Sequence, residues 1–148
     1  MKQLTPMEVG IPVIDLERML TFYCTVLGCE EVRRADIDAA LSSGLTTSAR
    51  GYVNVWLKTP KGEVIKLMHP SVPAQQAPRV DYLTERTGIA YLTFYCSDLN
   101  AVLEKAEAQG AVLRSDRQLL SGEIGIKLCF FDDPEGNVIE LVEPLQQP

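Results

Sequence analysis

The sequence contains an internal repeat, and this repeat limits the folds that the chain can adopt. Residues 59–70 (TPKGEVIKLMHP) align with residues 133–144 (DPEGNVIELVEP) at an offset of 74, with six of the twelve positions identical. The segments 8–16 (EVGIPVIDL) and 91–99 (YLTFYCSDL) align at an offset of 83, each with an Asp at its eighth position. A repeat of this kind indicates one structural unit that occurs twice. In 148 residues, two such units make up one ordinary domain.

Each half of the repeat predicts the same order of elements. An apolar strand, at residues 9–13 or 89–96, leads into a predicted N-cap, Asp15 or Asp98. Apolar residues then recur at helical spacing until Gly28 in the first half and Gly110 in the second. Three further strands are predicted per half, at residues 29–34, 52–58 and 64–68 and at residues 111–114, 125–131 and 138–142. Pro-Gly turns join the last two strands, so each half reads β-α-β-β-β.

Two segments fall outside this pattern. Residues 35–51 are small and polar, and they are weakly helical at their start. A connection of this length is usually functional or mobile. Residues 71–87 contain Pro73 and Pro78 and have little apolar periodicity, which predicts a linker without an element of its own. We therefore expect a single α+β domain over 1–148, with one module at 7–70, the linker at 71–87 and a second module at 88–145.

Composition excludes several classes of function. The net charge is −6 and the 14 basic residues are scattered, so neither a nucleic acid nor an anionic membrane is an expected partner. No apolar run approaches the roughly 18 residues of a membrane span, and the N-terminus lacks the apolar core of a signal peptide. The four cysteines form no C-x-x-C pair and are expected as free, buried thiols, which favours a cytoplasmic location.

Several segments carry a resemblance to a known family. They are residues 9–17 (VGIPVIDLE), 22–23 (FY), 27–28 (LG) and 132–141 (DDPEGNVIEL). Together with the duplicated β-α-β-β-β pattern, they resemble the vicinal oxygen chelate superfamily, which includes glyoxalase I, epimerases, extradiol dioxygenases and bleomycin resistance proteins. The resemblance covers residues 8–144 and implies two tandem modules whose curved mixed sheets surround a cavity. It says less about function, because one fold supports many chemistries.

The resemblance also implies where a functional site would lie. In metal-using members of the superfamily, four side chains from the first and last strands of the modules face one cavity, usually His or Gln, Glu or Gln, His, and Glu. The corresponding positions in this sequence are Glu8, Lys66, Tyr91 and Glu140. Only Glu140 keeps the common identity. An ammonium group repels a divalent ion, so the resemblance with Lys66 implies a site with no metal cofactor, in which Glu8 and Glu140 flank Lys66.

The residues themselves leave alternatives open. Strand alternation places Lys66 and Glu140 opposite their apolar neighbours, but the face that they share is either a cavity wall or the outer surface. Tyr91 is equally suited to the core. Asn54 and Trp56 alternate on one strand and would bind a ligand only if their face is concave; otherwise Trp56 is ordinary packing. The single histidine, His69, is expected to face away from Lys66 and to lie at the surface.

Three functions follow from the resemblance. The first is a glyoxalase-like enzyme, a lyase or isomerase of unknown substrate, with Lys66 as electrophile and Glu8 or Glu140 as base. The second is a binding protein similar to the bleomycin resistance members, with Trp56 and Tyr91 lining a cavity for a cationic or aromatic small molecule. The third, an extradiol dioxygenase, is disfavoured because one histidine cannot supply the two imidazoles that its iron needs. The resemblance also implies a homodimer, and each module has strand edges that such association would cover.

Overall fold

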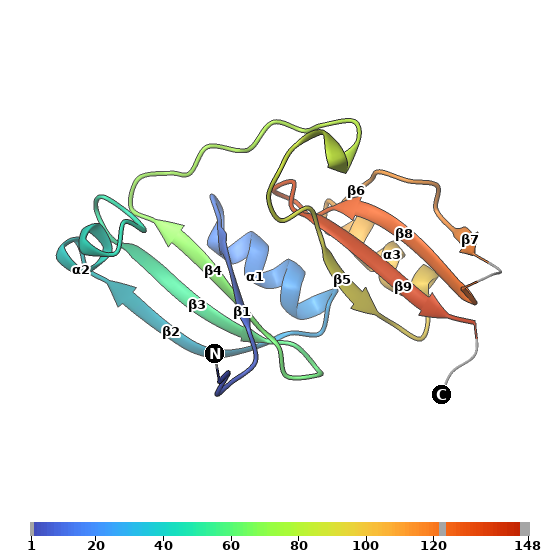
Figure 1. Ribbon diagram of the computed structural model, residues 1–148, viewed down its shortest axis with the longest axis horizontal. Coiled ribbons are helices and arrows are strands. Elements are labelled where there is room, and N and C mark those ends of the chain that lie inside the picture. Colours follow the sequence, from blue (N-terminus) through green and yellow to red (C-terminus); the bar gives the residue numbers. More distant parts are fainter. Residues whose placement is uncertain (1, 122–123, 146–148) are drawn as a thin grey trace. The chain divides into compact units, whose positions relative to one another are not determined.

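The computed structural model describes residues 2–121 and 124–145, which fold as two compact units divided between Gln75 and Gln76. Each unit has one mixed sheet, of four strands in the first and five in the second, and one ten-residue helix. Figure 1 shows this common plan, with α1 beside the first sheet and α3 beside the second. The α+β fold class predicted from the sequence is therefore confirmed.

The sheet of the first unit has the order β1-β4-β3-β2. Its strands are β1 (Glu8–Pro12), β2 (Glu30–Ile37), β3 (Tyr52–Lys58) and β4 (Val64–Pro70). β1 and β4 run parallel, whereas β3 is antiparallel to both of its neighbours. The face that includes Val55, Leu57, Ile65 and Leu67 is buried, and α1 packs against β4. The other face of this sheet carries the candidate site.

Helix α1 (Leu16–Thr25) forms where the apolar spacing predicts it. The Asp15 side chain accepts a hydrogen bond from the backbone N–H of Arg18 at 3.1 Å, which confirms it as the N-cap. Gly28 has a φ of 69°, a left-handed conformation that glycine adopts without strain. The helix itself ends at Thr25, and Leu27 is buried beyond its end.

The long connection between β2 and β3 is ordered around a short helix, α2 (Ala39–Gly44). Asp38 caps it by accepting from the Leu41 N–H at 2.9 Å. The buried Ser42 hydroxyl then accepts from the Gly51 N–H at 3.1 Å, which ties the end of the connection to the helix. The start of the segment expected over 35–51 is not helical, because residues 35–37 extend β2, and the helix begins at Ala39.

The second unit repeats the pattern with additions. Its strands are β5 (Leu92–Tyr95), β6 (Val112–Leu113), β7 (Leu119–Ser121), β8 (Ile126–Asp132) and β9 (Val138–Pro144), and its helix is α3 (Leu99–Ala108). The order is β5-β9-β8-β6, with β7 also paired to β8. Asp98 accepts from the Ala101 N–H at 3.0 Å, so the second predicted N-cap is also confirmed.

Three sequence expectations are wrong here. The strand expected over 89–96 covers only Leu92–Tyr95. β5 pairs in parallel with β9, and continuing the same register would put residues 89–90 opposite the 134–137 turn, which has no strand to pair with. Strand β7 was not expected at all. The linker, expected to lack elements, contains a short 3-10 helix, η1 (Leu83–Glu85).

The two Pro-Gly turns close in the same way. The Thr59 N–H donates to the Glu63 carbonyl at 2.9 Å, and the Asp133 N–H donates to the Asn137 carbonyl at 2.8 Å. These pairs are equivalent under the offset of 74, so the repeat is structural as well as sequential. In the described part of the chain, no helix is long and apolar enough to cross a membrane.

Candidate functional site

A row of three large side chains crosses the exposed face of the first sheet. Lys66 on β4 is the register partner of Trp56 on β3, and Trp56 is the partner of Arg33 on β2. The Lys66 Nζ atom lies 5.8 Å and the Arg33 Cζ atom 4.6 Å from the Trp56 ring centroid. The indole therefore has a cation from each neighbouring strand, an arrangement that the ring quadrupole favours.

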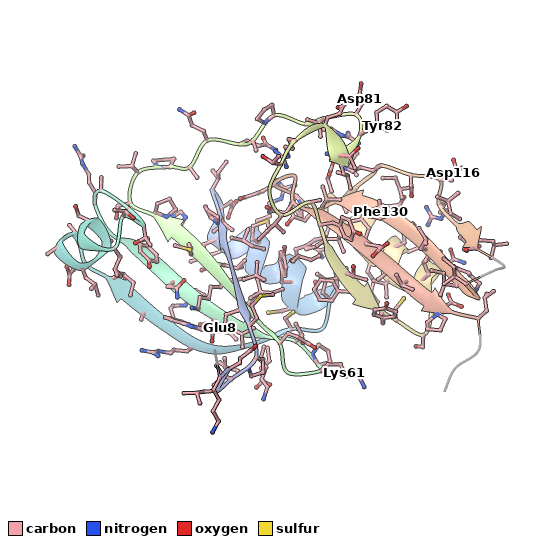
Figure 2. All side chains as sticks on the ribbon, in the orientation of Figure 1. Glu8, Lys61, Asp81, Tyr82, Asp116 and Phe130 are labelled. Atoms are coloured by element: carbon pink, nitrogen blue, oxygen red, sulfur yellow. The ribbon has the colours of Figure 1, made fainter. Side chains whose placement is uncertain are left out.

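Glu8 holds the Lys66 ammonium group. Its Oε2 atom is 2.5 Å from Lys66 Nζ, and Figure 2 shows Glu8 at the start of β1. The Glu8 side chain is 37% exposed and that of Lys66 is 32% exposed. A pair this accessible contributes little to stability, roughly 0–1 kcal/mol, but it leaves the ammonium within reach of a small molecule.

Asn54 lies two residues before Trp56 on the same face and is 4% exposed. Its Oδ1 atom has no hydrogen-bond partner among the residues that the structure describes. A buried amide oxygen left unpaired costs roughly 1–3 kcal/mol, so native proteins usually supply a donor. An N–H or O–H group of a ligand, or a water molecule, would meet this need.

The second unit carries the remaining candidates. Thr93 Oγ1 donates a hydrogen bond to Glu140 Oε2 at 2.6 Å across β5 and β9. The Tyr91 ring, 43% exposed, meets Phe130 edge to face with centroids 5.2 Å apart. Phe130 is the register partner of Glu140, so these four residues group at one face of the sheet.

The site therefore consists of two groups of residues. Glu8, Asn54, Trp56 and Lys66 share one face of the first sheet, and Tyr91 and Glu140 share a face of the second. Because the groups belong to different units, their meeting in one cavity stays a prediction. Sequence reasoning missed Arg33, Thr93 and Phe130. Phe130 could have been predicted from the repeat, because the offset of 74 makes it the equivalent of Trp56.

Comparison with known proteins decides the family. A model of the Glyoxalase/Bleomycin resistance protein/Dioxygenase superfamily matches residues 6–141. The chain belongs to this superfamily. No curated protein sequence matches it.

Solved structures of the superfamily support the fold. A glyoxalase family protein from Bacillus cereus is 22% identical, with a TM-score of 0.81 over 98% of this chain and 97% of that one. Glyoxalase I from Zea mays is 16% identical, with a TM-score of 0.70 over 97% of this chain and 46% of that one. A fosfomycin resistance protein from Listeria monocytogenes, solved with Mn(II) and sulfate, is 16% identical, with a TM-score of 0.62 over 97% and 93%. These identities support the fold alone.

A site without a divalent metal stays a prediction, and the chemistry of the described residues bears on it. Within residues 2–121 and 124–145, no group of three His, Cys, Asp or Glu side chains could hold a metal ion. Divalent ions need several neutral or anionic donors, whereas Lys66 presents a cation that is already paired with Glu8.

Other reactive side chains lie away from these faces. His69 and Lys66 are three residues apart on β4, so strand alternation turns them to opposite faces. All four cysteines are free; Cys29 and Cys129 are buried, and Cys24 and Cys96 are half-buried. Burial raises the pKa of Cys29 to about 12 and that of Cys129 to about 11. These two thiols are therefore protonated at neutral pH and are poor nucleophiles.

Proposed function

We propose that this protein is a glyoxalase-like enzyme, of the lyase or isomerase type, that acts on a small carbonyl compound without a divalent metal. The observation that carries the proposal is the Lys66 ammonium group, held by Glu8 at 2.5 Å on the open face of the first sheet. It supplies a fixed positive charge at a position where the family resemblance implies a metal ligand. A fixed charge of this kind is what a developing oxyanion requires.

The proposed reaction starts with removal of a proton from the carbon next to the carbonyl group. The C–H bond breaks, its electron pair forms the C=C bond of an enolate, and the carbonyl oxygen takes the negative charge. Lys66 donates a hydrogen bond to that oxygen, and Glu8 keeps the ammonium group in position. The carboxylate that takes the proton returns it to the substrate at the same or an adjacent atom.

Glu140 is better suited than Glu8 to act as the base. Glu8 Oε2 is occupied by Lys66, whereas Glu140 Oε2 accepts one hydrogen bond from the Thr93 hydroxyl, which orients the carboxylate. Trp56 and Tyr91 would contact the body of the substrate, and the unpaired Asn54 Oδ1 would accept a hydrogen bond from it. The proposal requires that the two groups of residues face one substrate.

Hydrogen exchange at carbon tests this function. Chelator-treated protein is incubated in D2O with an aldehyde, a ketone, a thioester and a 2-oxo acid, and loss of the α-proton signal is followed by NMR. We expect exchange with at least one compound and a loss of about 100-fold in Lys66→Met. Lys61→Met removes the same charge from the exposed β3–β4 turn and should keep full activity. Exchange that needs added metal, or that survives in Lys66→Met, would contradict the proposal.

A second candidate is a binding protein that sequesters a small molecule. The unpaired, buried Asn54 Oδ1 favours it, because a ligand donor would satisfy that atom without any chemistry. The sequence analysis expected a cationic or aromatic ligand. With Arg33 and Lys66 beside Trp56, a neutral or anionic aromatic ligand fits this face better than a cationic one. Saturable binding of a compound with no α-proton exchange would favour this candidate over the enzyme.

A further inference from the structure

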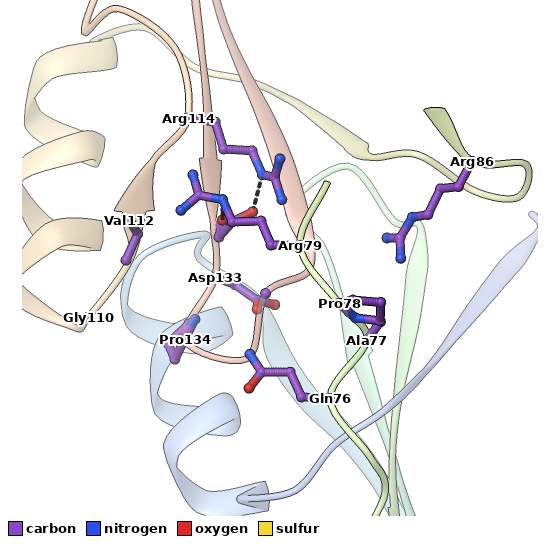
Figure 3. Close-up of a pocket in the computed structure, with 12 residues that line it drawn as sticks. Gln76, Ala77, Pro78, Arg79, Arg86, Gly110, Val112, Arg114, Asp133 and Pro134 are labelled. Atoms are coloured by element: carbon purple, nitrogen blue, oxygen red, sulfur yellow. Dashed lines mark hydrogen bonds and ion pairs between the residues drawn. The ribbon is translucent and has the colours of Figure 1, made fainter. Parts of the chain in front are cut away.

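The second unit contains a cavity of about 480 Å³, and none of the candidate site residues described above lines it. Figure 3 shows it between the extended segment 76–80, here called the strap, and the end of β8 with its following turn. Its size is that of a small-molecule site. Its lining includes Pro78, Arg79, Arg86, Val112, Arg114 and Pro134.

Two of the three arginines hold the strap in place. Arg114 and Arg79 both pair with the buried carboxylate of Asp132, Arg79 through Nε at 3.3 Å. Arg114 also donates to the Val80 carbonyl at 2.9 Å, and Gln76 Nε2 donates to the Glu135 carbonyl at 3.2 Å. Asp132 therefore forms ion pairs with two guanidinium groups. Together with the two backbone contacts, these pairs hold the strap against the end of β8.

The third arginine has no such role. Arg86 is exposed, and in the described part of the chain it takes part in no ion pair or side-chain hydrogen bond. It nevertheless lines the cavity, and Figure 3 shows it extending toward Pro78. Five guanidinium N–H donors are thus available at the cavity, in a planar group suited to bidentate binding of a carboxylate.

The charges around the cavity indicate the charge of its ligand. Three guanidinium groups and the carboxylates of Asp132 and Asp133 leave one positive charge in excess. The Asp133 carboxylate is satisfied, since it accepts hydrogen bonds from the Glu135 and Asn137 N–H groups and from Asn137 Nδ2. A ligand with one negative charge balances the site, whereas a phosphate dianion overcompensates it.

The remaining walls indicate the body of the ligand. Pro78 and Pro134 present rigid apolar rings, and Val112 is 52% exposed beside them. We propose that this cavity binds a small monocarboxylate with a compact apolar body, anchored by Arg86 and packed against Pro78, Pro134 and Val112. The site is separate from the proposed catalytic residues, so its failure would not affect the proposed function.

Benzoate is a suitable probe for the site. Labelled protein is titrated with sodium benzoate at constant ionic strength, and amide shifts are followed by NMR. We expect saturable shifts in residues 76–86 and 110–114, and at least tenfold weaker binding in Arg86→Gln. Arg50→Gln removes the same charge from an exposed position in the first unit and should bind like the wild type. Because Arg86 holds nothing in place, Arg86→Gln should keep its melting temperature.

Two further ligands sharpen the test. Benzamide has the same ring without the charge and should bind at least tenfold more weakly than benzoate. Inorganic phosphate should also bind more weakly. Equal binding of benzoate and benzamide, equal binding to Arg86→Gln and wild type, or no shift in the cavity amides would overturn the proposal. Tighter binding of phosphate would overturn its assignment to a monocarboxylate.

Discussion

Lys66 and Glu140 are equivalent in the repeat, yet one is a cation and the other an anion. Each contacts a different residue on its own sheet: Lys66 forms an ion pair with Glu8, and Glu140 accepts a hydrogen bond from Thr93. At the scale of single residues, we propose that this difference in charge distinguishes the chain from metal-using members of the superfamily. A substitution that restores the carboxylate should therefore restore some affinity for metal.

Lys66→Glu makes this testable. Glu8 would lose its counter-charge and meet a second carboxylate, so the variant should be less stable in chelator by about 1 kcal/mol. Added divalent metal should recover part of the loss, because the set would then be Glu8, Tyr91, Glu140 and a carboxylate at position 66. Thermal melts with and without metal measure this. Lys66→Met is the control and should not respond; a melting temperature of Lys66→Glu indifferent to metal would argue against a shared cavity.

At the scale of elements, helix α3 is tied to its sheet by Glu143 on β9. Lys127 Nζ donates to Glu143 Oε1 at 2.7 Å and the Leu99 N–H donates to Oε2 at 2.9 Å. These bonds, the one from Lys127 first, lower the pKa of Glu143 below its ordinary value. A carboxyl group with a lowered folded-state pKa stabilises the fold above its unfolded pKa and loses that contribution as the pH falls through the folded value.

Glu143→Gln should therefore be destabilised at pH 7, by about 1 kcal/mol, since charge-assisted bonds are lost at a helix N-terminus. The difference from the wild type should shrink as the pH falls below the folded pKa, where the wild-type carboxyl is itself neutral. Melting curves between neutral and acid pH measure it. Glu104→Gln, at an exposed position of the same helix, should have little effect at any pH. A loss for Glu143→Gln that is equal at all pH values would contradict the linkage.

The two Pro-Gly turns offer a matched pair for testing the strap. Gly62 has a φ of 104° and Gly136 a φ of 89°, so alanine at either position should cost about 1 kcal/mol in backbone strain. Only at Gly136 would the new Cβ lie 3.3 Å from Gln76 Nε2. We expect Gly136→Ala, and not Gly62→Ala, to speed hydrogen exchange in the strap. Equal exchange in the two variants would show that Gly136 does not support the strap.

Local signals explain how much of the fold could be predicted. Asp15 and Asp98 were recognisable as caps because each precedes an apolar helical pattern, and their hydrogen bonds depend only on residues three positions away. The start of β5 and the existence of β7 could not be predicted in this way. Both depend on pairing with β9 or β8, and three residues such as 119–121 have too few positions to show alternation.

The candidate site shows the same division. The repeat and the family pattern placed Glu8, Lys66, Tyr91 and Glu140 on strands or beside them, and the Glu8–Lys66 pair forms within one sheet. Arg33 could not be found from its sequence neighbourhood, because a register shift between Glu31 and Arg33 decides that it lies beside Trp56. Such a bulge changes the face that a side chain occupies without leaving a clear mark in the sequence.

At the scale of the whole molecule, we expect a homodimer. The outer strands of the first sheet, β1 and β2, each have one edge without a partner strand in the sheet order. Exposed edges of this kind are usually protected, and association of two copies is a common solution. Sedimentation velocity at micromolar concentration should give the mass of two 16.4 kDa chains. A single species with the mass of one chain would contradict the expectation.

At this scale too, we propose that Lys66 takes the place of a metal in the glyoxalase-superfamily site. The most direct test is the metal content of the protein, measured by mass spectrometry after purification with neither added metal nor chelator. The ammonium group of Lys66, paired with Glu8, predicts nickel, zinc, manganese and iron far below one ion per chain. A content of one nickel, zinc, manganese or iron ion per chain would contradict this proposal.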